Sequence, residues 1–123
     1  INSVIEVDLS GQCNAEFLAG HQFSGSGGQL DFVRGAYDSK GGKSILAFHS
    51  TAKNGTVSRI VARLSENAIV TTPRNDTHYL VTEFGSANLK GKSTRDRALA
   101  IIDLAHPNFR DELLRAAEDM YLM

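Results

Sequence analysis

Apolar and polar residues alternate at the start of the chain in a pattern typical of β-structure. Within residues 4–9, aliphatic side chains alternate with two carboxylates, and this period of two predicts a half-buried strand. Residues 10–12 are turn formers, and residues 13–18 fit a return strand. Four glycines then occupy nine positions at residues 20–28, too many for a helix interior, so this segment is predicted to be a loop.

The middle of the chain predicts one short helix and several strands. Leu30, Phe32, Val33 and Tyr37 have the spacing to share one helix face. Asn54-Gly55 is the strongest hairpin-turn signal in the sequence. A second turn is predicted where a proline begins a polar stretch. Runs rich in β-branched residues predict strands at residues 44–48, 57–64, 68–72 and 79–82, with the second turn at 73–76.

The last third changes to helical periodicity. Ser93 is a candidate N-cap, with Asp96 three residues later approximating a capping box. Apolar residues at helical spacing follow. Pro107 interrupts the pattern and starts a second helix. The stripes of these two helices consist of Ala98, Ile101, Ile102 and Ala105, and of Phe109, Leu113, Ala116, Ala117 and Met120. A β-rich body with a C-terminal helical hairpin predicts an α/β domain with a mixed sheet.

Composition narrows the possible functions. The chain has 123 residues, 41% hydrophobic and 22% charged, which suits one globular domain. A net charge of -1 provides no basic field for nucleic acid or a membrane surface. Cys13 is the only cysteine, which excludes an internal disulfide and a cysteine-based zinc site. The apolar runs are too short to span a membrane. The start at Ile1 lacks a signal-peptide pattern and suggests part of a longer chain.

The glycine-rich loop is the first candidate for chemistry. Ser24-Gly25-Ser26-Gly27-Gly28-Gln29 would let backbone N–H groups approach a ligand oxygen, but a strained turn is equally compatible. Leu30 stands where a dinucleotide fingerprint needs its third glycine. Gly41-Gly42-Lys43-Ser44 resembles the end of a P-loop, but Tyr37 replaces the leading glycine. Lys40 and Lys43 fit a solvated loop better than a phosphate site.

Glu83 is the second candidate, because it follows a predicted strand and precedes Phe84-Gly85. A carboxylate at a strand end is a common place for chemistry in α/β sheets, although a solvent-facing carboxylate is the more ordinary interpretation. The four histidines lack metal-ligand spacing, so no metal site is expected. Cys13 lies in a predicted strand and is expected to act as a small buried hydrophobe.

Several stretches together resemble a known family. Ser50-Thr51-Ala52-Lys53 and Ala105-His106-Pro107-Asn108-Phe109-Arg110 are two of them, and the others cover residues 2–12, 24–36 and 81–93. In this order they resemble the C-terminal domain of the acetyl-CoA hydrolase/transferase family. The family includes 4-hydroxybutyrate, butyrate and acetate CoA-transferases. The stretch 39–44 is most similar to the 4-hydroxybutyrate type.

The resemblance implies a fold, a reaction and a domain boundary. Residues 1–123 would form the CoA-binding C-terminal domain of a longer α/β chain with two CoA-transferase-like halves. Family members move CoA between carboxylic acids through a glutamyl-CoA thioester. The thioester-forming glutamate would lie upstream of Asn2, so the chain alone is expected to be inactive. Coenzyme A is then a substrate, and no covalent or metal cofactor is implied.

The resemblance also implies roles for individual residues. Gly25 matches a glycine whose backbone N–H helps to hold the thioester oxyanion. Asn2 and Gln22 fall near positions that contact CoA. Lys53 is a partner for CoA phosphate or pantetheine on weaker grounds. Glu83 matches a carboxylate close to the active site and is not the thioester-forming residue.

The partners follow from the same resemblance. We expect an acyl-CoA, a short-chain carboxylate and the upstream half of the same protein to contact this chain, in a cytoplasmic homo-oligomer that binds neither nucleic acid nor membrane. Cys13, Phe48-His49 and Ser65-Glu66-Asn67 depart from the family pattern and leave the choice of acid open. Acyl-CoA hydrolysis is the alternative reaction, and a non-catalytic acyl-CoA-binding module is the alternative class of protein.

Overall fold

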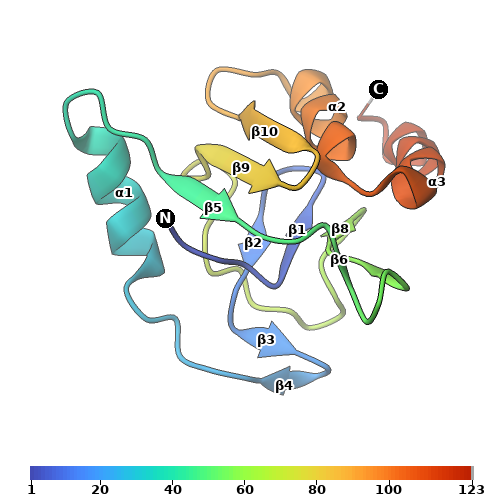
Figure 1. Cartoon of the computed structure of the whole chain (residues 1–123), viewed down its shortest axis with the longest axis horizontal. Helices are drawn as coiled ribbons and strands as arrows, with labels where there is room; N and C mark the ends of the chain where they lie inside the picture. The colour runs from blue at the N-terminus through green and yellow to red at the C-terminus, as the bar shows by residue number, and fades with distance from the viewer. Residues whose placement is uncertain (123) are drawn as a thin grey trace.

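A computed structural model describes residues 1–122, which form two small mixed sheets flanked by three helices (Figure 1). In the first sheet, β5 (Ile45–Ala47) is parallel to β9 (Tyr79–Thr82), and β9 is antiparallel to β10 (Gly85–Asn88). Asn2 extends this sheet through an isolated parallel bridge to Leu46. Strand β10 was not predicted, because its residues lack the β-branched pattern of a strand.

The second sheet has β1 (Glu6–Asp8) at its centre, antiparallel to β2 (Cys13–Asn14) and parallel to β8 (Ile60–Val61). The predicted half-burial of this strand is wrong, because all three residues of β1 are buried. Its acidic side chains are satisfied by neighbours. The Glu6 carboxylate accepts hydrogen bonds from the backbone N–H and the hydroxyl of Ser65, at 2.6 and 2.7 Å.

Two short hairpins project from these sheets. The hairpin predicted at Asn54-Gly55 is confirmed: β6 (Thr51–Ala52) pairs with β7 (Val57–Ser58), and Lys53, Asn54 and Gly55 all have positive φ. The second hairpin pairs β3 (Phe17–Leu18) with β4 (His21–Gln22). The predicted strands 13–18 and 57–64 are therefore each divided into two shorter strands.

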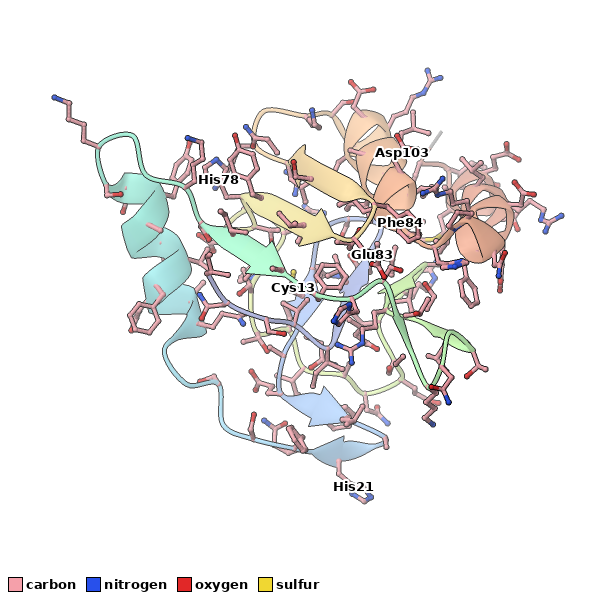
Figure 2. All side chains as sticks on the ribbon, in the orientation of Figure 1. Cys13, His21, His78, Glu83, Phe84 and Asp103 are labelled. Atoms are coloured by element: carbon pink, nitrogen blue, oxygen red, sulfur yellow. The ribbon has the colours of Figure 1, made fainter. Side chains whose placement is uncertain are left out.

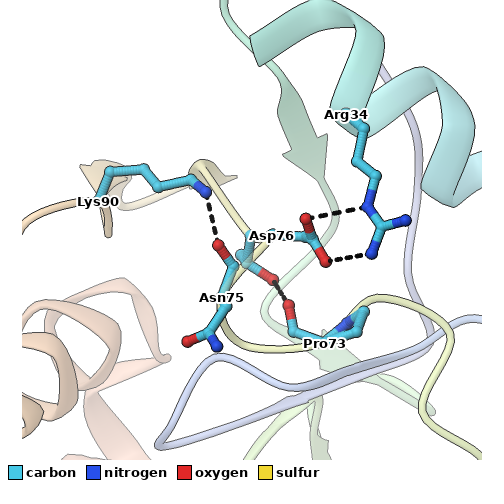
Figure 3. Close-up of polar contacts among 6 residues, drawn as sticks. Arg34, Pro73, Asn75, Asp76 and Lys90 are labelled. Atoms are coloured by element: carbon cyan, nitrogen blue, oxygen red, sulfur yellow. Dashed lines mark hydrogen bonds and ion pairs between the residues drawn. The ribbon is translucent and has the colours of Figure 1, made fainter. Parts of the chain in front are cut away.

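The predicted strand at residues 68–72 is wrong. Ile69 and Val70 are 45% and 39% exposed, and only Thr72 makes an isolated bridge, to Cys13. The predicted turn that follows is confirmed, since the Asp76 N–H donates to the Pro73 carbonyl at 3.0 Å. Figure 3 shows that Arg34 from α1 pairs with Asp76, while Lys90 donates to the Asn75 carbonyl. These contacts fix the turn against the rest of the molecule.

The three helices are α1 (Gln29–Asp38), α2 (Thr94–Leu104) and α3 (Pro107–Asp119). The predicted N-cap of α2 is confirmed, because the Ser93 hydroxyl accepts from the Asp96 N–H. His106 caps α3, with Pro107 in its first turn. The predicted apolar face of α1 is wrong in part: Val33 is buried, but Phe32 and Tyr37 are 68% and 46% exposed.

The hydrophobic core lies between the sheets and the C-terminal helices. Helix α2 packs on β8, β9 and β10, and α3 packs on α2. The predicted mixed α/β architecture with a helical hairpin is confirmed, with two small sheets in place of one. The largest fully buried apolar side chains are Leu9, Leu46, Ile60, Leu80, Leu89, Ile101, Val7 and Val33.

Candidate functional site

Glu83 lies at the reversal between β9 and β10, beside a cavity of about 400 Å³ (Figure 2). The backbone N–H of Ser50 donates to the Glu83 Oε1 at 2.8 Å. The strand end thus presents an exposed carboxylate held at one oxygen. The cavity is lined by Ser3, Ala47, Phe48, His49, Arg59, Val81, Thr82 and Glu83.

The surroundings of Glu83 favour its ionised form. Partial desolvation raises the pKa of the carboxyl group, but the backbone N–H groups of Ser50 and of Glu83 itself lower it, and the charge of His49 lowers it further. The net result is a pKa below the ordinary value for glutamate. Glu83 is therefore a carboxylate at neutral pH, able to accept a proton or a hydrogen bond.

Ser50 is a site residue that the sequence did not single out. It is fully buried, and its hydroxyl has no hydrogen-bond partner among the described residues. Its carbonyl accepts from the Arg59 N–H at 2.8 Å, so the segment that holds Glu83 is itself tied to the β7–β8 region. The stretch Ser50-Thr51-Ala52-Lys53 was noted in the sequence as part of the family resemblance. Its contact with Glu83 could not be predicted, because the two residues are 33 positions apart in the chain.

The same cavity combines apolar walls with basic groups. Ala47, Phe48 and Val81 supply apolar surface, while His49 and Arg59 supply nitrogen donors to the cavity that Glu83 also lines. The apolar lining suits a short acyl chain, and the nitrogen donors suit a carboxylate. This combination suits the handling of small carboxylic acids or their esters.

The glycine-rich loop lies apart from Glu83. It joins β4 to α1 along the opposite side of the molecule from β9 (Figure 1). Gly25 is exposed, a Cβ added there would meet nothing within 4 Å, and its φ is not positive. Within the loop it is Gly27, with φ 58°, and not Gly25, that adopts a left-handed backbone. A direct approach of a ligand to Gly25 stays a prediction.

Asn2 lines a second cavity, of about 430 Å³, between the first sheet and α1. Its N–H donates to the Ile45 carbonyl and its carbonyl accepts from the Ala47 N–H, both at 2.9 Å. Ser44 also lines this cavity, and its buried hydroxyl has no partner among the residues described. Asn2 and Glu83 thus lie at neighbouring cavities, because Ser3 lines the one beside Glu83.

The remaining two predicted residues are exposed on hairpins. The Gln22 side chain, on β4, donates to the Glu16 carboxylate at 3.0 Å and to the Ser24 carbonyl at 2.7 Å. Lys53 is exposed at the β6–β7 turn, three residues after Ser50. Gln22 therefore contacts the start of the glycine-rich loop, whereas Lys53 has no contact with Glu83 among the described hydrogen bonds.

Within residues 1–122, no group of three or more histidine, cysteine, aspartate or glutamate side chains is placed to hold a metal ion. Cys13 is the small buried residue expected from the sequence, with a pKa raised to about 12 by burial. None of the helices in this described part has the length and apolar character needed to cross a membrane.

Comparison with known proteins identifies the domain. The acetyl-CoA hydrolase/transferase C-terminal domain family matches residues 1–117. The chain belongs to this family. It is 55% identical to the succinyl-CoA:cyclohexane-1-carboxylate CoA transferase of Geobacter metallireducens, over 98% of this chain and 28% of that protein. It is also 55% identical to the 4-hydroxybutyrate coenzyme A transferase of Clostridium kluyveri, over 93% of this chain and 27% of that protein.

A crystal structure carries the same fold. RipA from Yersinia pestis is 63% identical, with a TM-score of 0.92, over 99% of this chain and 27% of RipA. The chain spans about a quarter of the length of these relatives. The family predicted from the sequence is confirmed.

Proposed function

We propose that residues 1–123 are the CoA-binding C-terminal domain of a CoA-transferase that exchanges CoA between an acyl-CoA and a short-chain carboxylic acid. The observation that carries the proposal is Glu83, held by the Ser50 N–H at a cavity lined by both apolar and basic residues. The names of the relatives above support the reaction class.

The reaction needs a nucleophile from outside this chain. A glutamate of the upstream half attacks the acyl-CoA carbonyl and releases CoA as a thiolate, which then takes the glutamyl carbonyl and frees the first acid. The acceptor carboxylate reverses these steps and leaves as the new acyl-CoA. Glu83 acts beside the reacting atoms as a fixed carboxylate that positions groups or exchanges a proton.

The other predicted residues have supporting roles in this proposal. The Gly25 N–H stabilises the thioester oxyanion. For this role, the upstream half or the bound substrate must place the reacting carbonyl beside the glycine-rich loop. Asn2 and Gln22 contact CoA from the cavity by α1 and from β4. Lys53, on the hairpin after Ser50, meets a phosphate or the pantetheine chain.

His49 and Arg59 favour transfer over hydrolysis. Hydrolysis needs only a water molecule at the thioester, whereas transfer needs a bound carboxylate acceptor. Two basic side chains at the cavity would hold that carboxylate acceptor near the thioester, and hydrolysis by water does not need them. A homo-oligomer and a cytoplasmic location stay predictions from the resemblance, as does the identity of the acids.

An isotope-exchange experiment tests the proposal. The full-length protein that contains this chain, given butyryl-CoA and labelled acetate, should form labelled acetyl-CoA with ping-pong kinetics. Free CoA thiol released in a parallel sample without acetate measures hydrolysis. Residues 1–123 alone should give only background exchange, because the nucleophile is absent. Hydrolysis without exchange would establish a hydrolase, and CoA binding without either would establish a binding module.

A further inference from the structure

A third cavity, of about 220 Å³, opens at the N-terminal end of α2 and has a different character from those described above. It lies far from Glu83. The Thr82 hydroxyl, next to Glu83, donates to the Leu104 carbonyl at the other end of the helix. Eleven residues of helix rise by about 16 Å, which separates the two cavities. The third cavity is lined by Ser10, Arg74, Asn75, Lys92, Thr94 and Arg97.

The lining carries three positive charges and no carboxylate. Arg74 comes from the turn at residues 73–76, Lys92 from the loop after β10, and Arg97 from α2. Among the described residues none of the three forms an ion pair. Like charges that converge in a cavity repel one another, so the arrangement favours an anion that neutralises them.

Arg97 is a fixed part of this cavity. Its Nη1 donates to the carbonyls of Arg74 and Ser10, at 2.7 and 3.2 Å, and its Nη2 donates to the Leu89 carbonyl at 3.1 Å. All these acceptors are neutral, so they orient the guanidinium without cancelling its charge. Burial, together with the charge of Arg74, lowers the pKa of Arg97, which is the effect of an uncompensated cation.

Two carboxylates close in sequence to the lining residues have partners elsewhere, and a third does not line the cavity. Asp8 accepts from the backbone N–H and hydroxyl of Ser10 and from Gln12. Asp76 pairs with Arg34 on the far side of the turn (Figure 3). Asp96 lies in the first turn of α2 but does not line the cavity.

We propose that this cavity binds a phosphate dianion, either free inorganic phosphate or the terminal phosphate of a phosphomonoester. Arg74 and Lys92 line the cavity from two different loops and Arg97 lines it from α2, and the hydroxyl of Thr94 supplies a further donor. The first backbone N–H groups of α2 add partial positive charge to the same end. Phosphate binding at this cavity requires no step of the proposed transferase reaction.

Phosphate binding to the full-length protein, measured by isothermal titration calorimetry at constant ionic strength, tests the site. Arg74→Gln with Lys92→Gln removes two charges from exposed side chains, so the fold should be retained. Losing both charges should weaken phosphate binding by about 30-fold, which corresponds to about 2 kcal/mol. The control is Arg95→Gln with Lys40→Gln, which removes the same charge from exposed positions outside the cavity.

We expect the control variant to bind phosphate with wild-type affinity and the cavity variant to bind it more weakly. Equal affinity in all three proteins, equal weakening in both variants, or no binding by the wild type would overturn the proposal. Competition distinguishes the two sources of phosphate. Displacement by CoA but not by dephospho-CoA would identify the 3′-phosphate of CoA as the ligand group, whereas displacement by neither would identify free phosphate. Failure of CoA exchange in the separate assay would leave this result unaffected.

Discussion

Replacing Glu83 by glutamine removes a negative charge and changes almost nothing else in the shape of the side chain. The glutamine oxygen can still accept the Ser50 N–H, which lies 2.8 Å from Oε1. Glu83 is exposed and makes no other side-chain hydrogen bond among the residues described. The melting temperature of the full-length variant should therefore stay within the range of ordinary surface substitutions.

The size of the kinetic effect separates two roles. If Glu83 only anchors the loop, the variant exchanges a charge-assisted hydrogen bond for a neutral one, a loss of about 1 kcal/mol or less than about tenfold in rate. Water around the exposed carboxylate reduces that figure further. If Glu83 exchanges a proton or orients the substrate, the loss is about 10²-fold or more. We expect the larger effect.

The assay is CoA exchange between butyryl-CoA and labelled acetate, with the turnover number and KM determined separately. Glu112→Gln is a matched control, because Glu112 is also exposed but belongs to α3 and lines a different cavity. A Glu83→Gln enzyme with wild-type turnover and wild-type stability would refute a role for this carboxylate. A loss of turnover that Glu112→Gln reproduces would show a nonspecific effect of charge.

Three further predictions concern the glycines, the cysteine and the core. Gly25→Val should leave the melting temperature unchanged, because a Cβ at this position meets no other atom, but it should slow enzyme–CoA thioester formation by about 10²–10³-fold in stopped-flow measurements if the Gly25 N–H stabilises the oxyanion. Gly11→Ala should lower the free energy of unfolding by about 1–3 kcal/mol, because Gly11 has φ 97° and the added Cβ would lie 3.1 Å from Arg97. Cys13, with a pKa of about 12, should resist alkylation at pH 8 until the protein unfolds. The thiol ionises near pH 9 in the unfolded chain but not in the folded one, so the unfolded state is favoured as the pH rises. Urea denaturation should therefore show the free energy of unfolding falling by up to about 1.4 kcal/mol per pH unit between pH 9 and 12, relative to Cys13→Ala. Leu80→Ala, in the central strand β9 with a fully buried side chain, should cost about 2–5 kcal/mol of unfolding free energy, and a smaller loss would mean that the core around β9 is loosely packed.

The elements that the sequence predicted correctly have strong local causes. Asn54-Gly55 accepts the positive φ of a tight hairpin, and Ser93 caps α2 through its own hydroxyl. Both signals act within a few residues and need no partner from elsewhere. The helical hairpin was predicted for the same reason, since Pro107 separates two apolar stripes.

The wrong predictions involve contacts distant in sequence. The strand at Glu6–Asp8 looks amphipathic, but Ser65 satisfies Glu6 from 59 residues away, so a carboxylate can lie in the interior. Residues 68–72 have β-branched side chains, yet no neighbouring strand pairs with them beyond the Thr72 bridge. An alternating or β-branched pattern shows that a segment favours an extended conformation, but it does not show that a neighbouring strand is present to pair with it.

The candidate site divides in the same way. Glu83 was found because it follows a recognisable strand, whereas Ser50, His49 and Arg59 join it only through the parallel pairing of β5 with β9 and the course of the chain after them. Gly25 was singled out by the family resemblance, and the glycine of this loop that needs conformational freedom is Gly27. The role of the Gly25 N–H stays a prediction.

Locating the CoA adduct tests the central proposal most directly. The full-length protein is incubated with butyryl-CoA without an acceptor, digested, and examined by mass spectrometry for a peptide carrying CoA as a glutamyl thioester. We predict one modified glutamate, outside residues 1–123, that loses its CoA when acetate is added. A CoA thioester on Glu83, or turnover with no covalent adduct, would contradict the proposed division of labour between this domain and the rest of the protein.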